Sequence, residues 1–168
     1  MAQLRKFLNS VLNVLAGVSF IAMVALVTWQ VFTRYVLKNP STWSEELVGY
    51  MFAWMALFGA SLVTGERGHM NIPVVVERFS MGGRKFFAIL AEVVALVFSA
   101  AILVYGGLQI ASLAMGQMTS SLGVAIGTFY WVMPVCGVLN VLYTIMNIVD
   151  ICNGKICLKT ADELEKEA

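Results

Sequence analysis

Charged residues are scarce in this sequence. Only 12% of its 168 residues are Asp, Glu, Lys or Arg, whereas 60% are hydrophobic, and the mean hydropathy is +0.82. In soluble domains about a quarter of the residues are charged. The composition therefore predicts an integral membrane protein in contact with membrane lipids. The net charge of +1 gives no reason to expect a nucleic-acid partner.

Histidine and cysteine are also sparse. His69 is the one histidine, so the chain has no pair of histidines to hold a haem, and a membrane redox protein is disfavoured. Cys136, Cys152 and Cys157 show neither CxxC spacing nor a nearby histidine, so no zinc site or disulfide framework is expected. Hydrolase, metalloprotease and P-loop motifs are missing. The sequence therefore predicts no cofactor, no metal and no enzymatic activity.

Four long apolar segments are each able to cross a hydrocarbon core of about 30 Å. In the second, Leu47 to Thr64 carries no charge, and Thr42 with Glu45 has the spacing of a capping box that starts a helix. The chain is thus expected to be all-α, with one membrane domain over residues 1–168. The predicted spans are about 11–33, 45–64, 86–115 and 124–150.

The remaining segments refine this picture. Apolar residues of 72–80 fall on one helical face, which predicts a short helix lying in the cytoplasmic interface. The third span, at about 45 Å, is too long for a bilayer and should protrude or bend, with Gly106-Gly107 as the expected bend. Pro134 is expected to kink the fourth span. Residues 151–168 form a charged cytoplasmic tail.

Lysine and arginine are unevenly divided between the two sides. With four spans, nine of them lie on one side, and only Arg34 and Lys38 lie on the other. Because lysine and arginine are enriched on the cytoplasmic side of membrane proteins, both termini and the connection over residues 65–85 are predicted to be cytoplasmic. The turn between the first two spans then faces outward.

Arg34, Glu45 and Glu46 come together across that outer turn. One interpretation is that Arg34 reaches lipid headgroups while the acids only cap the second helix. The other is an ion pair that fixes the turn and offers a docking face to another protein. Acid–base catalysis is not expected, because the two glutamates lie at a wetted boundary and not in a closed cavity.

Glu92 lies about 9 Å inside the third span by helical rise. A carboxylate at that depth is costly unless it is paired or faces water. It is interpreted either as hydrogen-bonded, with Asn140 and Asn147 as candidate partners, or as a proton- or cation-coupling acid. The second interpretation gives the alternative function, a self-contained homodimeric four-helix exporter.

Two further features are less specific. Ala56 and Ala60 belong to a stripe of small residues, which predicts close packing within the bundle or against another membrane protein. Arg67 and His69 lie in the cytoplasmic connection, where His69 is interpreted as a polar loop residue.

Three blocks of sequence, taken together, closely resemble one family. They are QVFTRY at residues 30–35, the turn from Asn39-Pro40 through WSEEL at residues 43–47, and RGHMNI at residues 67–72. With four spans, they resemble the small membrane subunit of tripartite ATP-independent periplasmic (TRAP) transporters, the DctQ family. The sequence departs from the family pattern at Ile72-Pro73, where relatives often have valine and aspartate.

The resemblance implies a bacterial inner-membrane subunit that binds a large, elevator-type membrane subunit. A periplasmic binding protein would deliver an organic acid, such as sialic acid or a C4-dicarboxylate, and sodium coupling is expected in the large subunit. The small subunit would enlarge the static scaffold. The outer turn would help to dock the binding protein through Arg34, Trp43, Glu45 and Glu46.

Overall fold

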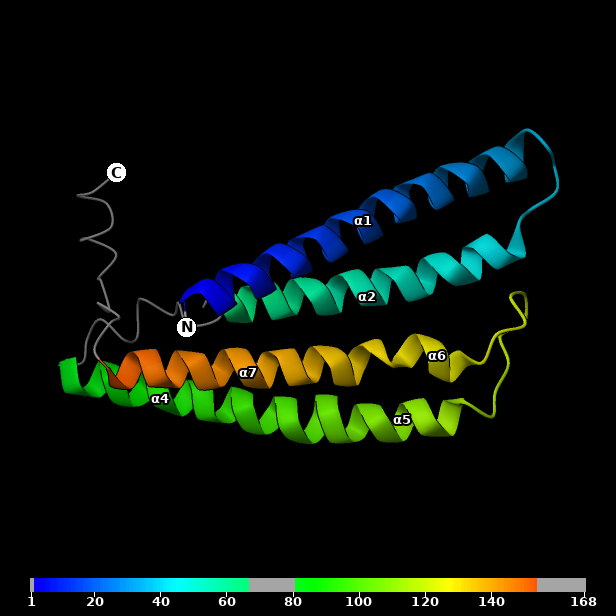
Figure 1. The fold of residues 1–168 in the computed structure, drawn as a ribbon. Coiled ribbons are helices and arrows are strands. Elements are labelled where there is room, and N and C mark those ends of the chain that lie inside the picture. The colour runs from blue at the N-terminus through cyan, green and yellow to red at the C-terminus, as the bar shows by residue number, and fades with distance from the viewer. Residues whose placement is uncertain (1, 67–80, 154–168) are drawn as a thin grey trace, which may run out of the picture.

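The computed structural model describes residues 2–66 and 81–153, and this part of the chain forms two helical hairpins (Figure 1). In the first hairpin, α1 (Ala2–Tyr35) is followed by α2 (Thr42–Glu66), which runs back beside it. Figure 1 shows that α1 and α2 diverge towards the turn that joins them. The first hairpin is therefore closed at one end and splayed at the other.

The second hairpin has a continuous helical rod as its first arm. That rod consists of α4 (Met81–Phe98), the π-helix η2 (Ser99–Gly106) and α5 (Gly107–Ala114). Its returning arm consists of α6 (Ile126–Tyr130) and α7 (Val132–Cys152). We call the end that holds the turns 36–41 and 115–125 the hairpin end, and the opposite end, where α1 begins and α7 finishes, the terminal end (Figure 1).

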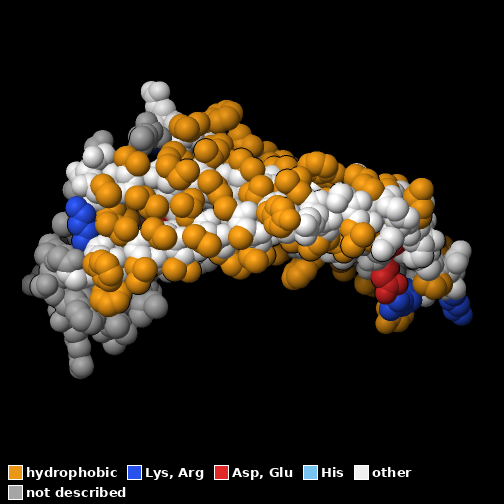
Figure 2. All heavy atoms as spheres, turned by 90° about the horizontal axis from the view of Figure 1, so that it is seen from below, with side chains coloured by type: hydrophobic (Ala, Val, Ile, Leu, Met, Phe, Trp, Pro, Cys, Tyr) orange, Lys and Arg blue, Asp and Glu red, His pale blue; other side chains and the backbone are white. Residues whose placement is uncertain are grey.

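Four helices in the described residues are long and apolar enough to cross a membrane, which confirms the all-helical, four-span prediction. They cover residues 3–35, 42–66, 85–114 and 126–152. On the face shown in Figure 2, apolar side chains cover the length of the bundle, and charged side chains gather at its two ends. The predicted interfacial helix at 72–80, the loop residues Arg67 and His69, and the tail beyond residue 153 lie outside the described residues.

The start of α2 corrects one prediction. The backbone N–H of Glu45 donates to the Ser41 carbonyl at 3.4 Å, and the helix begins at Thr42. The residue whose carbonyl accepts the first helical bond is the N-cap, so the N-cap is Ser41. The predicted capping box of Thr42 and Glu45 is wrong by one residue, and this shift leaves Glu45 able to face α1.

The third and fourth spans each contain a helical irregularity near the residue that is expected to bend or kink them. The π-helix η2 occupies the eight residues that end at Gly106, and α5 continues from Gly107. The fourth span is interrupted at Trp131, between α6 and α7. Pro134 has no N–H to donate to the carbonyl four residues before it, that of Tyr130, so the discontinuity lies one turn ahead of the proline.

The core lies where α2 meets α7. Of the most apolar window of the fourth span, 44% is buried, compared with 11% for each of the first two spans, so α7 is the central helix. The buried core side chains are Leu12, Phe58, Cys136, Tyr143 and Met146. On the opposite side of α7, a Cβ added at Gly137 would lie 2.8 Å from Leu103 of η2. Glycine is thus required where the two arms of the second hairpin touch.

Candidate docking surface and intramembrane polar network

The outer turn holds an ion pair at the hairpin end. Arg34 lies in the last turn of α1 and Glu45 in the first turn of α2, with Nη2 and Oε2 3.8 Å apart. The two side chains are 59% and 68% exposed. An exposed pair of this kind contributes about 0–1 kcal/mol. Both side chains are thus placed near each other by the turn but are held only loosely.

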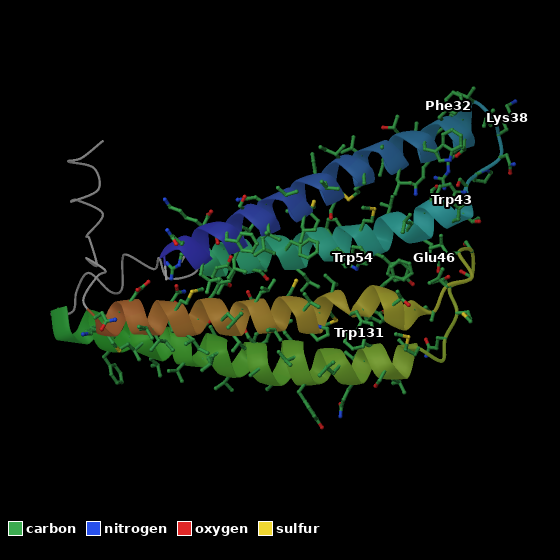
Figure 3. All side chains as sticks on the ribbon, viewed as in Figure 1. Phe32, Lys38, Trp43, Glu46, Trp54 and Trp131 are labelled. Atoms are coloured by element: carbon green, nitrogen blue, oxygen red, sulfur yellow. The ribbon has the colours of Figure 1, made fainter. Side chains whose placement is uncertain are left out.

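Glu46 has a different role from its neighbour. Its carboxylate accepts hydrogen bonds from the backbone N–H groups of Ser120, at 3.3 Å, and Ser121, at 3.0 Å. Figure 3 shows Glu46 on the side of α2 that faces the turn between α5 and α6. Glu46 therefore joins the two hairpins, a contact that no local sequence pattern indicates because its partners lie 74 and 75 residues away.

Aromatic residues that follow Glu46 along α2 make further contacts between the two hairpins. The Trp54 indole N–H donates to the Phe129 carbonyl at 2.8 Å, and the Tyr50 ring stacks on the Phe129 ring with centroids 4.2 Å apart. Trp43, in contrast, is 42% exposed at the start of α2 (Figure 3). The four-residue spacing of Tyr50 and Trp54 marks one face of α2, and this signal was missed in the sequence.

A polar network lies at the terminal end, with Asn147 at its centre. The Asn147 side-chain amide donates to Glu92 Oε1 at 2.9 Å and to the Thr64 carbonyl at 3.1 Å. Arg5 donates to Asn147 Oδ1 at 2.8 Å and to Asp150 at 3.3 Å. One buried side chain on α7 therefore connects its own helix with α1, α2 and α4, so the network joins all four spans.

The structure distinguishes between the two asparagines that were predicted as partners of Glu92. Glu92 is 4% exposed, and Asn147 is the one that binds it. Asn140 is also buried, but its Oδ1 has no hydrogen-bond partner among the described residues. Arg5, which from the sequence is only one of the basic residues predicted on the cytoplasmic side, completes this network.

A second bond reinforces the terminal end. The Tyr143 hydroxyl donates to Asn9 Oδ1 at 2.6 Å. Beside this pair, a Cβ added at Gly65 would lie 2.8 Å from the Tyr143 ring and 3.0 Å from Asn9. Because Gly65 has no side chain, α2 can approach both α1 and α7 at this point.

Ala56 and Ala60 are exposed on α2, as are Gly49 and Ala53 on the same side of the helix. Packing of Ala56 and Ala60 within the bundle is therefore not observed in the described part of the chain. The alternative prediction, packing against another membrane protein, still accounts for them. No cluster of His, Cys, Asp and Glu residues within 2–66 and 81–153 could hold a metal ion.

The structure thus defines a four-span membrane protein whose first hairpin has a large surface left exposed by the rest of the described residues. Residues 23–153 match the family described as tripartite ATP-independent periplasmic transporters, DctQ component. The chain belongs to this family of small TRAP transporter subunits, as the resemblance predicted. Its members are transporter subunits and not enzymes, and membership favours this interpretation over an exporter based on Glu92.

Two relatives carry names that describe small permeases. The chain is 30% identical over 138 residues to the sialic acid TRAP transporter small permease protein SiaQ of Vibrio cholerae, covering 82% of this chain and 79% of SiaQ. It is also 30% identical over 99 residues to the C4-dicarboxylate TRAP transporter small permease protein DctQ of the same organism, covering 59% of this chain and 43% of DctQ.

A third relative is a larger protein. The chain is 30% identical over 81 residues to the sialic acid TRAP transporter permease protein SiaT of Haemophilus influenzae. The match covers 48% of this chain but only 13% of SiaT. A segment similar to this chain is thus part of a much longer permease, which is consistent with a large-subunit partner.

Proposed function

We propose that this chain is the scaffold subunit of a sodium-coupled TRAP transporter that imports an organic acid delivered by a periplasmic binding protein. The names of the relatives support two substrate classes, sialic acid and C4-dicarboxylates. Sodium coupling belongs to the large subunit in this proposal. The nine basic residues on one side against two on the other support an inner-membrane protein with both termini in the cytoplasm.

The uncovered small-residue face of α2 is the observation that carries the scaffold role. Gly49, Ala53, Ala56 and Ala60 are exposed along this face. In a membrane, helices gain little from apolar burial alone, and small residues favour association because they allow close backbone contact. In our proposal the large subunit packs here, and its moving domain then works against a broader static frame.

Replacing Ala56 by leucine tests this interface. Overpacking costs about 1–3 kcal/mol, so we expect at least about a fivefold loss of large subunit co-purified from native membranes. Ala91→Leu is the matched control, because Ala91 is also exposed but lies on α4. If A56L retains the large subunit and A91L loses it, the interface lies on α4 and the proposal for α2 is wrong.

The loosely held ion pair supports a docking role for the outer turn. Arg34, Trp43 and Glu45 are exposed at the hairpin end, which is periplasmic in the proposed orientation. Rim charges of this kind mainly guide the approach of a partner and change its rate of association. We therefore propose that these three residues contact the binding protein, whereas Glu46 acts indirectly by holding the neighbouring turn.

Charge reversal at Glu45 tests docking without disturbing that turn. We expect Glu45→Arg to lower binding-protein-dependent uptake by about fivefold, while co-purification of the large subunit stays unchanged. Glu66→Arg reverses an exposed acid at the terminal end of the same helix and should leave uptake near the wild-type value. Equal uptake by both variants would exclude Glu45 from docking.

A further inference from the structure

A small polar cavity lies between the end of α1 and the start of α2. Its volume is about 200 Å³, and its polar lining comes from Gln30, Arg34, Tyr35, Ser41 and Glu45. It occupies the splayed part of the first hairpin, close to the turn in Figure 1. The cavity therefore lies at the level where a membrane span ends and lipid headgroups begin.

Two polar atoms in the cavity lining have no hydrogen-bond partner among the described residues. They are Gln30 Nε2 and Ser41 Oγ, and both atoms are buried. Buried polar groups in proteins are nearly always paired, so an unpaired amide nitrogen and an unpaired hydroxyl in the lining of one cavity indicate that a binding partner is missing. Both residues are only half-buried, so a change of rotamer is enough to turn either group towards a ligand.

The charged groups of the lining also have unused hydrogen-bonding capacity. A charge-assisted bond between nitrogen and oxygen is about 2.7–2.9 Å long, whereas Arg34 and Glu45 are 3.8 Å apart. The planar guanidinium of Arg34 can therefore bind a phosphate through two parallel bonds. Glu45 can accept hydrogen bonds from an ammonium group at the same time. The cavity thus offers one anion site beside one cation site.

We propose that this cavity binds the headgroup of a zwitterionic phospholipid with a primary amine, namely phosphatidylethanolamine. Arg34 and the Gln30 and Ser41 donors bind the phosphate, and Glu45 binds the ammonium group. Val31 lines the cavity, Val27 lies one turn earlier on α1, and they are 52% and 41% exposed, which provides an apolar surface for the acyl chains. The lipid fills the splayed space between α1 and α2.

Native mass spectrometry of the full-length chain tests this proposal. The protein would be extracted from vesicles of phosphatidylethanolamine and phosphatidylglycerol, and retained lipid would be counted. We expect one retained phosphatidylethanolamine and about a tenfold loss of it in Arg34→Gln. Lys38→Gln removes a positive charge from the same turn but not from the cavity lining, and it should retain the lipid.

A second variant tests the cation site separately from the anion site. Because it should still retain lipid, it also shows whether a substitution in the cavity lining leaves the protein folded. Glu45→Gln keeps the phosphate site, so it should still retain lipid but no longer prefer phosphatidylethanolamine over phosphatidylglycerol. Equal retention by wild type and Arg34→Gln would overturn the proposal. Displacement of the lipid by soluble glycerophosphoethanolamine at equal concentration would also overturn it, because the site would then bind a free phosphate ester. Wild-type lipid retention combined with lost binding of the periplasmic protein in Arg34→Gln would leave docking as the role of Arg34 and overturn the lipid site.

Discussion

The two ends of the bundle are built in opposite ways. At the terminal end, Asn147 joins side chains and backbone from all four spans, and Gly65 lets α2 lie directly on Tyr143. At the hairpin end, α1 departs from α2, and its contact there is an exposed ion pair 3.8 Å long. Helix α1 is therefore anchored at one end and is free to adapt to lipid or protein at the other.

The largest effect is expected where the terminal end is most tightly packed. Gly65→Ala places a Cβ 2.8 Å from the Tyr143 ring and should lower the free energy of unfolding by about 2 kcal/mol. Gly59→Ala is the matched control on the same helix, because an added Cβ there has no atom within 4 Å. Reversible unfolding in mixed micelles would measure both. Equal stabilities would show that the terminal end is not closely packed.

A smaller loss is expected when the centre of the polar network is removed. Asn147→Leu takes away the donor to Glu92 and the acceptor of Arg5, and should cost about 1–2 kcal/mol in the same unfolding measurement. Arg34→Gln breaks the ion pair at the hairpin end and should cost less than about 0.5 kcal/mol. If Arg34→Gln lowers the free energy of unfolding more than Asn147→Leu does, the terminal end is not the more strongly stabilised end.

The smallest effect should be local and confined to the hairpin end. Glu46→Gln weakens two charge-assisted bonds, so the amide hydrogens of Ser120 and Ser121 should exchange about tenfold faster. Glu45→Gln, one residue earlier, leaves both bonds in place and should not change their exchange. Hydrogen exchange read by mass spectrometry distinguishes the two. Faster exchange in the Glu45 variant would mean that both glutamates hold the turn.

The elements of this fold could be predicted from sequence, because four apolar stretches of bilayer length leave few other arrangements. Their mutual packing could not. In helices that are apolar on every side, the pattern of hydrophobic residues does not tell which face is inside. Ala56 and Ala60 illustrate this, since the same small residues fit an internal contact and an external one.

The candidate sites were predictable where the residues are close in sequence or chemically unusual. Arg34 and Glu45 lie across a short turn, and Glu92 stands out as an acid within an apolar span. The contacts of Glu46 with Ser120 and of Arg5 with Asn147 join residues 74 and 142 positions apart. Only the fold brings such pairs together, so neither could be read from local patterns.

The direction of the two core helices has an electrostatic consequence. Both α2 and α7 run towards the terminal end, so their macrodipoles are parallel and both have their partial negative charge towards that end of the bundle (Figure 1). Arg5 lies at this end, and Lys85 Nζ donates to the Cys152 carbonyl at 3.4 Å. These cations lie near the negative ends of the two aligned helices and offset part of the repulsion between them.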